Sequence, residues 1–176
     1  MMHTVYTFMD DRSIPILSAY ATPLLAALMQ PVHDFDRPQG LTPCAGLADV
    51  VYTDGLRLKG LLFDRAPVPI TLPLISSTTR TAFAVLLARS VYANPDFLWW
   101  ADGWISGRDR TRATAYEMLS RPLPSNDRAY VAHWAGMSAA FPHEHTLAAQ
   151  TAALIVAYVS HSVDFATVAD AALAIA

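Results

Sequence analysis

The hydrophobic positions of the first half of the chain fall in short runs of β-prone residue types, which are typical of β-strands. These runs cover residues 3–9, 49–53 and 56–63. The dipeptide Asp54-Gly55 separates the last two runs and is the signature of a two-residue hairpin turn. We therefore expect an antiparallel β-hairpin at 49–63. The expected cross-strand pairs are Thr53–Leu56 and Val51–Leu58, and the expected core face consists of Val51, Leu56, Leu58 and Leu62.

A further run covers residues 68–75, alternates strictly in hydrophobicity and is marked by prolines. Pro67, Pro69 and Pro73 all occupy positions of the same parity. In a strand, backbone N–H groups of the same parity point to the same side, so these prolines remove donors from one side only. The run therefore predicts an edge strand that is left unpaired on its proline side. The side chains expected to share its apolar face are Val68, Ile70, Leu72 and Leu74.

Two helix starts are also expected in the first half. Ser13-Ile14-Pro15 resembles a helix start, and Thr22-Pro23 places a capping threonine before a proline at the first helical position. The second helix should end at Gln30, because Pro31 follows. The segment 31–46, rich in proline and glycine, predicts an irregular loop.

The second half of the chain has the longer periodicity of helices. The expected helices cover 78–92, 108–120, 127–141, 144–160 and 165–175, the last with Asp164 as its N-cap. Within 127–141, the large side chains Tyr130, Trp134, Met137 and Phe141 form an apolar stripe that predicts a buried face. Together the two halves indicate one α+β domain over 1–176, with a small antiparallel sheet packed on a mainly helical C-terminal half.

Composition changes this picture by pointing to a partner. Charged residues make up 15% of the chain and hydrophobic residues 53%, and the mean hydropathy is +0.28. Soluble domains have about 25% charged residues, so this chain has more apolar surface than its core readily hides. The formal net charge of -3 provides no global basic field for nucleic acid or membranes. Lys59 is the one lysine among many arginines, a bias typical of a GC-rich, bacterial coding sequence.

The cysteine content and the length of the apolar segments indicate the cellular compartment in which the protein is expected. Cys44 is the single cysteine, so neither an intrachain disulfide nor a thiolate metal site can be built. The start of the chain lacks the basic and apolar regions of a signal peptide. The longest apolar helix candidate, 147–159, is shorter than the ~20 residues that span a bilayer. We therefore expect a cytoplasmic protein.

The most unusual stretch lies between residues 97 and 112, where tryptophans are followed by arginines. Both residue types are preferred anchors of protein interfaces. The alternatives are a tryptophan-rich core loop followed by solvated arginines, or a platform that stacks bases and holds phosphates. Asp102 and Asp109 dilute the positive charge and disfavour nucleic acid. The candidate interface residues are Trp99, Trp100, Trp104, Arg108, Arg110 and Arg112.

A second candidate site is the turn between the run 68–75 and the following helix. A helix N-terminus offers unpaired N–H groups, and hydroxyls with an arginine would suit a phosphate. The simpler interpretation is an ordinary serine or threonine N-cap. Over about ten residues the turn resembles the phosphate loop of ParB and sulfiredoxin-like folds, with Ser77 near the place of the expected glycine. The candidate phosphate-binding residues are Ser76, Ser77, Thr78 and Arg80.

The sequence His143-Glu144-His145 suggests a metal site, but its spacing is not that of zinc hydrolases. On a helix, positions i and i+2 lie about 200° apart and cannot easily share one ion. A site would need the segment to be extended and a third ligand from the loop that holds His33, Asp34 and Asp36. We favour a helix start stabilised by Glu144, and we expect no metal and no other cofactor.

The function expected from these patterns is that of a non-enzymatic protein that binds another protein. It would be an accessory, regulatory or inhibitory subunit of a complex, or a homo-oligomer, and it would have no catalytic residues. The first alternative is a phosphate-binding, nucleic-acid-binding or nucleotide-processing domain that uses residues 76–80 with Arg108, Arg110 and Arg112. The second alternative is a metal-dependent hydrolase that uses His143 and His145.

Overall fold

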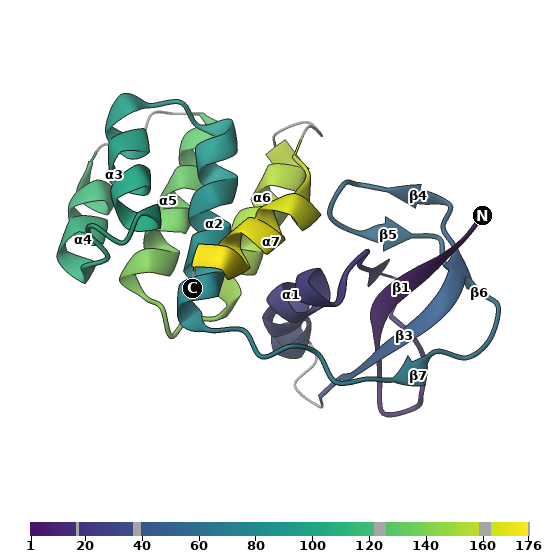
Figure 1. Cartoon of the computed structure of the whole chain (residues 1–176). Helices are drawn as coiled ribbons and strands as arrows, with labels where there is room; N and C mark the ends of the chain where they lie inside the picture. The colour runs from purple at the N-terminus through teal and green to yellow at the C-terminus, as the bar shows by residue number, and fades with distance from the viewer. Residues whose placement is uncertain (17, 37–39, 122–125, 159–162, 176) are drawn as a thin grey trace. The chain divides into compact units, whose positions relative to one another are not determined.

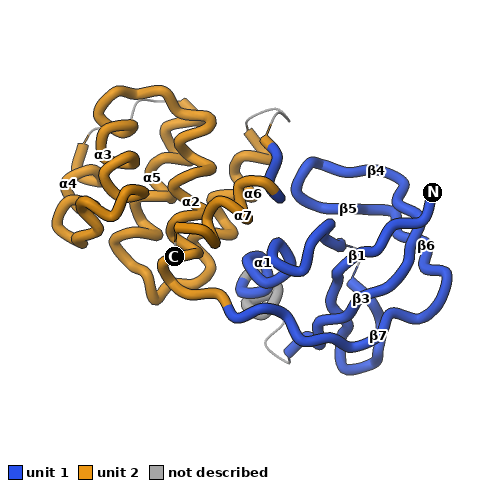
Figure 2. The backbone as a smooth tube through the Cα atoms, viewed as in Figure 1, with its two compact units in different colours: residues 1–74, 164–166 blue, residues 75–163, 167–176 orange. Residues whose placement is uncertain are grey.

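A computed structural model confirms the expected α+β fold and divides the chain into two compact units. It describes residues 1–16, 18–36, 40–121, 126–158 and 163–175, with the side chains of 32–36 left out. Unit 1 contains Met1–Leu74 and Asp164–Ala166, and unit 2 contains Ile75–Val163 and Thr167–Ala176 (Figure 2). That the whole chain forms a single domain stays a prediction.

Unit 1 is built on a four-stranded antiparallel sheet whose central member is β3 (Thr42–Asp49) (Figure 1). The long strand β1 (Met2–Met9), predicted at 3–9, pairs with β3 along its whole length. The short strands β6 (Leu62–Phe63) and β7 (Val68–Pro69) also pair with β3. A second, three-stranded sheet has the order β2 (Ser18–Ala19), β5 (Leu58–Lys59) and β4 (Tyr52–Thr53).

One face of the four-stranded sheet forms a core of unit 1. Val5 on β1 and Ala48 on β3 are fully buried there together with Ala19 on β2. Gly46 lies opposite Val5, and a Cβ atom at this glycine would come within 3.1 Å of the Phe63 ring. The glycine thus lets the aromatic ring cover the strand. The partly buried side chains packed against this core are Val50, Leu58, Leu61 and Phe63.

The prediction of an irregular loop at 31–46 was wrong, since β3 begins at Thr42. A proline inside a central strand removes a ladder hydrogen bond, which is why Pro43 argued against a strand. The carbonyl of Pro43 accepts a hydrogen bond from Ile70 N at 2.9 Å, on the side of β7. Because N–H and C=O of one residue point to the same side, the missing donor also lies there. The ladder with β1 therefore loses no hydrogen bond.

The hairpin at 49–63 is confirmed, but its register differs from the expected one. Thr53 lies opposite Leu58, with a four-residue loop in place of a two-residue turn. Asp54 shapes this loop, because its carboxylate accepts hydrogen bonds from Arg57 N at 2.7 Å and pairs with Lys59 Nζ at 2.9 Å. Burial opposes ionisation of Asp54, but these contacts outweigh it and hold the pKa of the carboxyl below its ordinary value.

The predicted core face of the hairpin is only half correct. Leu56 is buried and Leu58 partly so, whereas Val51 is 75% exposed and Leu62 is 71% exposed. The strand expected at 56–63 is broken at Gly60, which has a φ of +67°. After this bend the chain leaves the small sheet, and Leu62 joins β3 in the other sheet. The alternation of side chains therefore does not carry through from β5 to β6.

The proline-marked edge strand is confirmed over a shorter span, as β7. Ile70 N donates to β3, so even-numbered donors face the sheet, and Pro67 and Pro69 face away from it as expected. Leu72 is buried, but Val68 and Leu74 are exposed, so the apolar face predicted for this run is not continuous.

The helices of the first half differ from expectation at their ends. No helix begins at Ser13, where φ is +60° in a turn closed by Asp10, and Pro15 forms an antiparallel bridge with Met9. Thr22 does cap a helix, with Leu25 N donating to its hydroxyl at 3.1 Å. That helix, α1 (Pro23–Asp36), continues past Pro31, where the expectation placed its end. An internal proline removes one hydrogen bond and crowds the carbonyl four residues earlier, at a cost of about 3 kcal/mol, so it weakens a helix without always ending it.

Unit 2 is made of helices joined by short connections. They are α2 (Ser77–Val91), α3 (Pro95–Ile105), α4 (Arg112–Ser120), α5 (Asp127–Ala140), α6 (Thr146–Tyr158) and α7 (Phe165–Ile175), whose first residues belong to unit 1. The helix α3 was not predicted, α4 and α6 begin later than expected, and Asp164 caps α7 as expected.

The buried face of α5 is the one with small residues, which corrects the predicted aromatic stripe. Tyr130 is 51% exposed, and Trp134 and Met137 are only partly buried. Small side chains allow neighbouring helices to approach closely, and α5 packs against α2, α4 and α6. A Cβ atom at Gly136 would collide with the side chain of Met118 on α4. The buried residues of α5 are Ala129, Val131, Ala132, Ala135, Gly136, Ser138, Ala139 and Ala140.

Replacement of Gly60 by alanine should destabilise unit 1 more than the matched change Gly40→Ala. Both glycines have positive φ, which costs about 1–2 kcal/mol for another residue. A Cβ atom at Gly60 would in addition lie 2.6 Å from the Val51 Cβ, whereas nothing lies within 4 Å at Gly40. Urea unfolding of the two variants measures the difference. Equal losses would show that the contact with Val51 relaxes without cost.

The thiol of Cys44 should react with a disulfide reagent only when unit 1 unfolds. Cys44 is fully buried in β3, and burial raises the pKa of its thiol to about 11, which suppresses the reactive thiolate. The matched control is Leu47→Cys in a Cys44→Ser background, because Leu47 is exposed on the same strand. Fast native labelling of Cys44, at the rate of the control, would contradict the buried placement.

Candidate functional site

The tryptophans of the candidate interface lie on the helix α3. Asn94 caps this helix, with its side-chain oxygen accepting from the N–H groups of Asp96 and Phe97, and Pro95 occupies the first turn. Trp100 and Trp104 are one helical turn apart and both are buried, so they belong to the core of unit 2. Trp99 faces the other way and is 68% exposed.

Two of the three arginines bind the ends of helices. The Nε atom of Arg110 donates to the carbonyl of Trp104 at 3.0 Å, and its NH2 group donates to Ile105 and, on α7, to Ile175. The Nε atom of Arg112 donates to the carbonyl of Ala140, at the end of α5, at 2.8 Å. The last carbonyls of a helix lack partners within it and carry partial negative charge, so a guanidinium satisfies both needs.

Arg108 and Trp99 form the exposed part of this segment. The guanidinium carbon of Arg108 lies 5.4 Å from the centre of the Trp99 ring, within cation–π range. Next to it, Asp109 accepts a hydrogen bond from Thr111 N at 3.0 Å, and this bond holds the pKa of the Asp109 carboxyl below its ordinary value. The interface prediction remains untested, and its exposed aromatic member is Trp99.

The candidate phosphate-binding turn serves as the cap of α2. The Ser76 hydroxyl accepts a hydrogen bond from Thr79 N at 3.0 Å, which is the simpler interpretation of the sequence. Ser77 and Thr78 lie in the first turn of the helix, and Arg80 is half-buried, with its pKa lowered by burial. Binding of a phosphate at this turn stays a prediction.

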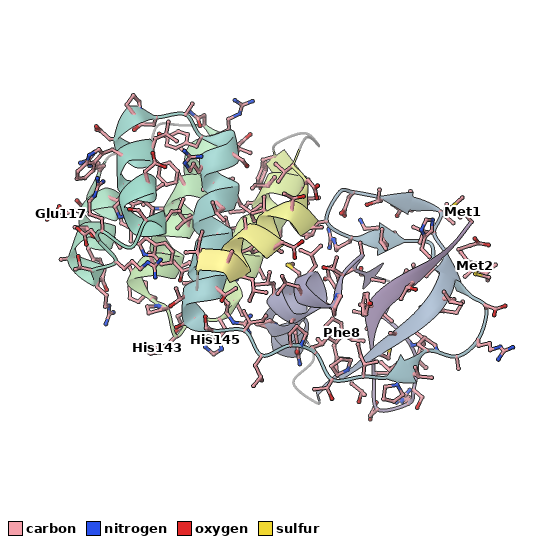
Figure 3. All side chains as sticks on the ribbon, in the orientation of Figure 1. Met1, Met2, Phe8, Glu117, His143 and His145 are labelled. Atoms are coloured by element: carbon pink, nitrogen blue, oxygen red, sulfur yellow. The ribbon has the colours of Figure 1, made fainter. Side chains whose placement is uncertain are left out.

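His143 and His145 lie in the turn that precedes α6 (Figure 3). The helix begins at Thr146 rather than at Glu144, whose backbone carbonyl accepts from Leu147 N at 3.1 Å. Within the described part of the chain, no three His, Cys, Asp or Glu side chains cluster closely enough to hold a metal ion. The side chains of His33, Asp34 and Asp36, proposed as further ligands, lie outside the described residues.

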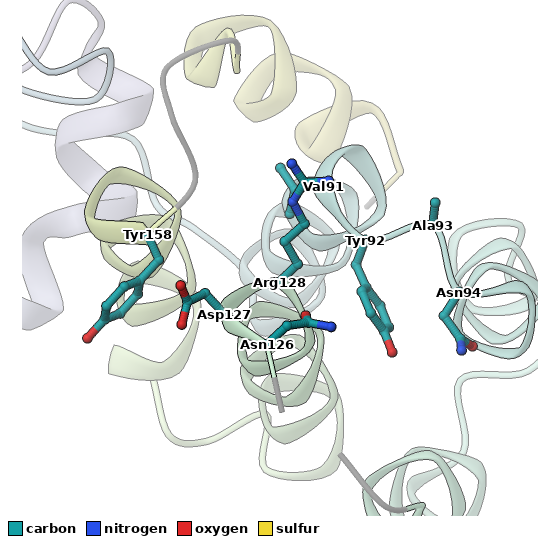
Figure 4. Close-up of a pocket in the computed structure, with 8 residues that line it drawn as sticks. All are labelled: Val91, Tyr92, Ala93, Asn94, Asn126, Asp127, Arg128 and Tyr158. Carbon is teal, nitrogen blue, oxygen red and sulfur yellow. The ribbon is translucent and has the colours of Figure 1, made fainter. Parts of the chain in front are cut away.

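A pocket of about 510 Å³ that the sequence analysis did not predict lies at one end of the helices of unit 2 (Figure 4). Two of its residues, Asn94 and Asn126, already cap α3 and α5 with their side-chain oxygens. Recognising both asparagines as N-caps would have marked two helix starts, but it would not have shown that these starts meet or that a ligand binds there. The pocket is lined by Val91, Tyr92, Ala93, Asn94, Asn126, Asp127, Arg128 and Tyr158.

Comparison of the chain with models of protein families, with curated proteins and with solved structures gives no match. Among the helices that the structure describes, none is long and apolar enough to cross a membrane.

Replacement of Arg110 by methionine should destabilise unit 2, whereas Arg108→Met should not. Arg110→Met keeps much of the side-chain volume but removes the charged donors to the carbonyls of Trp104 and Ile105. The Trp104 carbonyl keeps its hydrogen bond from Gly107 N, so the expected cost is about 1.5 kcal/mol. Arg108 makes an exposed contact, so its replacement should change stability by less than about 0.5 kcal/mol. Thermal unfolding of both variants measures the two losses of stability. Equal losses would refute the different roles assigned to Arg110 and Arg108.

Proposed function

We propose that this chain is a non-enzymatic protein that acts by binding another protein through the exposed face of α3. The observation that carries the proposal is the solvent-exposed Trp99, with the Arg108 guanidinium carbon 5.4 Å from the centre of its ring. Tryptophan and arginine are the residue types most enriched among the energetically dominant residues of interfaces. A ring held on a helix loses little conformational entropy when a partner covers it.

The surroundings of Trp99 support the same function. Asp96 and Asp102 lie three residues before and after Trp99, which places them on the same helix face. Asp102 pairs with Arg89 at 2.7 Å, and Asp96 pairs with Arg121 at 2.7 Å. The exposed aromatic ring is therefore flanked by ion pairs, and an apolar centre within a polar rim is the usual composition of a protein interface.

The charges around Trp99 favour a protein partner over a nucleic acid. Asp96 and Asp102 each neutralise an arginine, and Arg110 and Arg112 donate to helix carbonyls. Binding of nucleic acid depends on cations that contact phosphates. A partner with an apolar pocket for the indole ring and an acceptor for Arg108 suits this surface better.

Site-specific photo-crosslinking tests the proposal. A benzophenone amino acid in place of Trp99 should form one defined adduct with a protein of the native host. The matched control carries it in place of Tyr130, which is also exposed and lies on α5. The captured protein, once purified, should bind Trp99→Ala about tenfold or more weakly than the unaltered chain, a loss of about 1.4 kcal/mol.

Two outcomes would overturn the proposal. One is the same set of adducts from both positions, which would indicate random encounters. The other is unchanged affinity of the purified partner for Trp99→Ala, which would remove α3 from the interface. Circular dichroism of the variant confirms that the exposed substitution leaves unit 2 folded.

A further inference from the structure

We propose that unit 1 has a second, separate binding site, at which an extended peptide segment of a partner protein pairs as an added strand with β1 at Met2–Thr4. This mode of recognition combines main-chain hydrogen bonds along a strand edge with a pocket for alternate side chains. The argument rests on the pairing of β1 and on a groove beside it, and it does not depend on α3.

The first step is the direction of the backbone groups of β1. Tyr6 N donates to Tyr20 O at 3.0 Å, and Tyr20 N donates to Tyr6 O at 2.8 Å. The groups of Tyr6 therefore face away from β3. Since backbone groups alternate along a strand, those of Met2 and Thr4 face the same outer side.

The second step is that the chain leaves this side of β1 before it reaches Thr4. Antiparallel pairing along this side ends at Tyr20, because Thr22 caps α1 and the backbone turns into that helix. Within the described part of the chain, Met2 and Thr4 have no strand partner on this side. Met2 and Thr4 are both exposed residues, so their N–H and C=O groups form an open edge of the kind that accepts another strand.

The third step is a groove of about 490 Å³ that shares Thr4 with this edge. Its apolar side chains come from Val50, Val51 and Leu58, and its lining includes no carboxylate, ammonium or guanidinium group. In a paired strand, every second side chain points to the same face. A bound peptide would therefore place alternate, uncharged apolar side chains in the groove. The complete lining is His3, Thr4, Ala21, Val50, Val51, Tyr52, Thr53 and Leu58.

An extended peptide suits this place better than a small apolar molecule or a second copy of the chain. A small apolar molecule would fill the groove but leave the backbone groups of Met2 and Thr4 unpaired. A second copy would bring an edge as short as this one, closed at Tyr6 by Tyr20. A peptide can continue along the groove beyond the paired residues, which adds apolar contact to the hydrogen bonds.

Selection from a phage library of random ten-residue peptides, with the full chain as target, tests the proposal. Synthetic copies of the enriched peptides should carry apolar residues at alternate positions and should slow hydrogen exchange of the Thr4 amide. Thr4→Pro removes that amide without breaking the ladder with β3, so it should weaken binding about tenfold. Thr4→Val keeps the amide and should bind within about twofold of the unaltered chain.

A second pair of variants keeps the test decisive if Thr4→Pro fails to fold. Val51 and Leu62 are both exposed, but only Val51 lines the groove. Val51→Glu should lose peptide binding, and Leu62→Glu should keep it. Trp99→Ala should also bind the peptides normally, which separates this site from the one on α3.

Three results would overturn the proposal. The first is that no peptide is enriched. The second is that the enriched peptides bind Val51→Glu as tightly as the unaltered chain and leave exchange at Thr4 unchanged. The third is a dimer in light scattering that Thr4→Pro abolishes, which would make a second copy of the chain the occupant of the edge.

Discussion

Unit 1 depends on the antiparallel ladder between β1 and β3. These strands have eight residues each, whereas every other strand in the described part of the chain has two. Short strands gain little from their own hydrogen bonds and hold their place by attachment to a longer one. β6 and β7 attach to β3, and β2 lies beside β1. Because the ladder fixes which side chains face the core, it also fixes the direction of the edge at Met2–Thr4.

Unit 2 is held together by small side chains and by arginines that act inside the fold. The alanine-rich face of α5 allows close approach of α2, α4 and α6, which buries area without large side chains. Arg110 and Arg112 donate hydrogen bonds to the carbonyls at helix ends. The low charge content of the chain suggested a large exposed apolar surface. Many of the apolar residues are instead buried between the closely packed helices of unit 2, so less apolar surface is available to partners. What remains exposed at α3 is one indole ring, that of Trp99.

The sequence predicted the elements better than their partners. The hairpin around Asp54, the cap at Thr22 and the parity of Pro67 and Pro69 follow from local rules of backbone geometry, and these predictions were confirmed. The register of the hairpin was wrong, because the carboxylate of Asp54 stabilises a longer loop. Pro43 led to the wrong prediction of a loop. Its missing donor affects only the side of β3 that faces β7, and the local sequence does not show which side of a strand a proline faces.

For the candidate interface, too, the sequence predicted the segment but not how its side chains are placed. Composition singled out the segment from Trp99 to Arg112, but only packing distinguishes its exposed indole from the buried ones. Neither the pocket of unit 2 nor the groove beside Thr4 has a signal in the sequence, because each is formed by residues far apart along the chain.

The prolines of β7 set how far the four-stranded sheet can grow. Pro67 and Pro69 offer no donors on the outer side, and β6 is two residues long, so in the described chain β1 provides the edge most able to accept a strand. A sheet with one accepting edge can pair with only one other molecule. Two copies joined through it would form a closed pair with no accepting edge left over. A fibre requires every molecule to pair twice, so growth of the four-stranded sheet would stop at that pair.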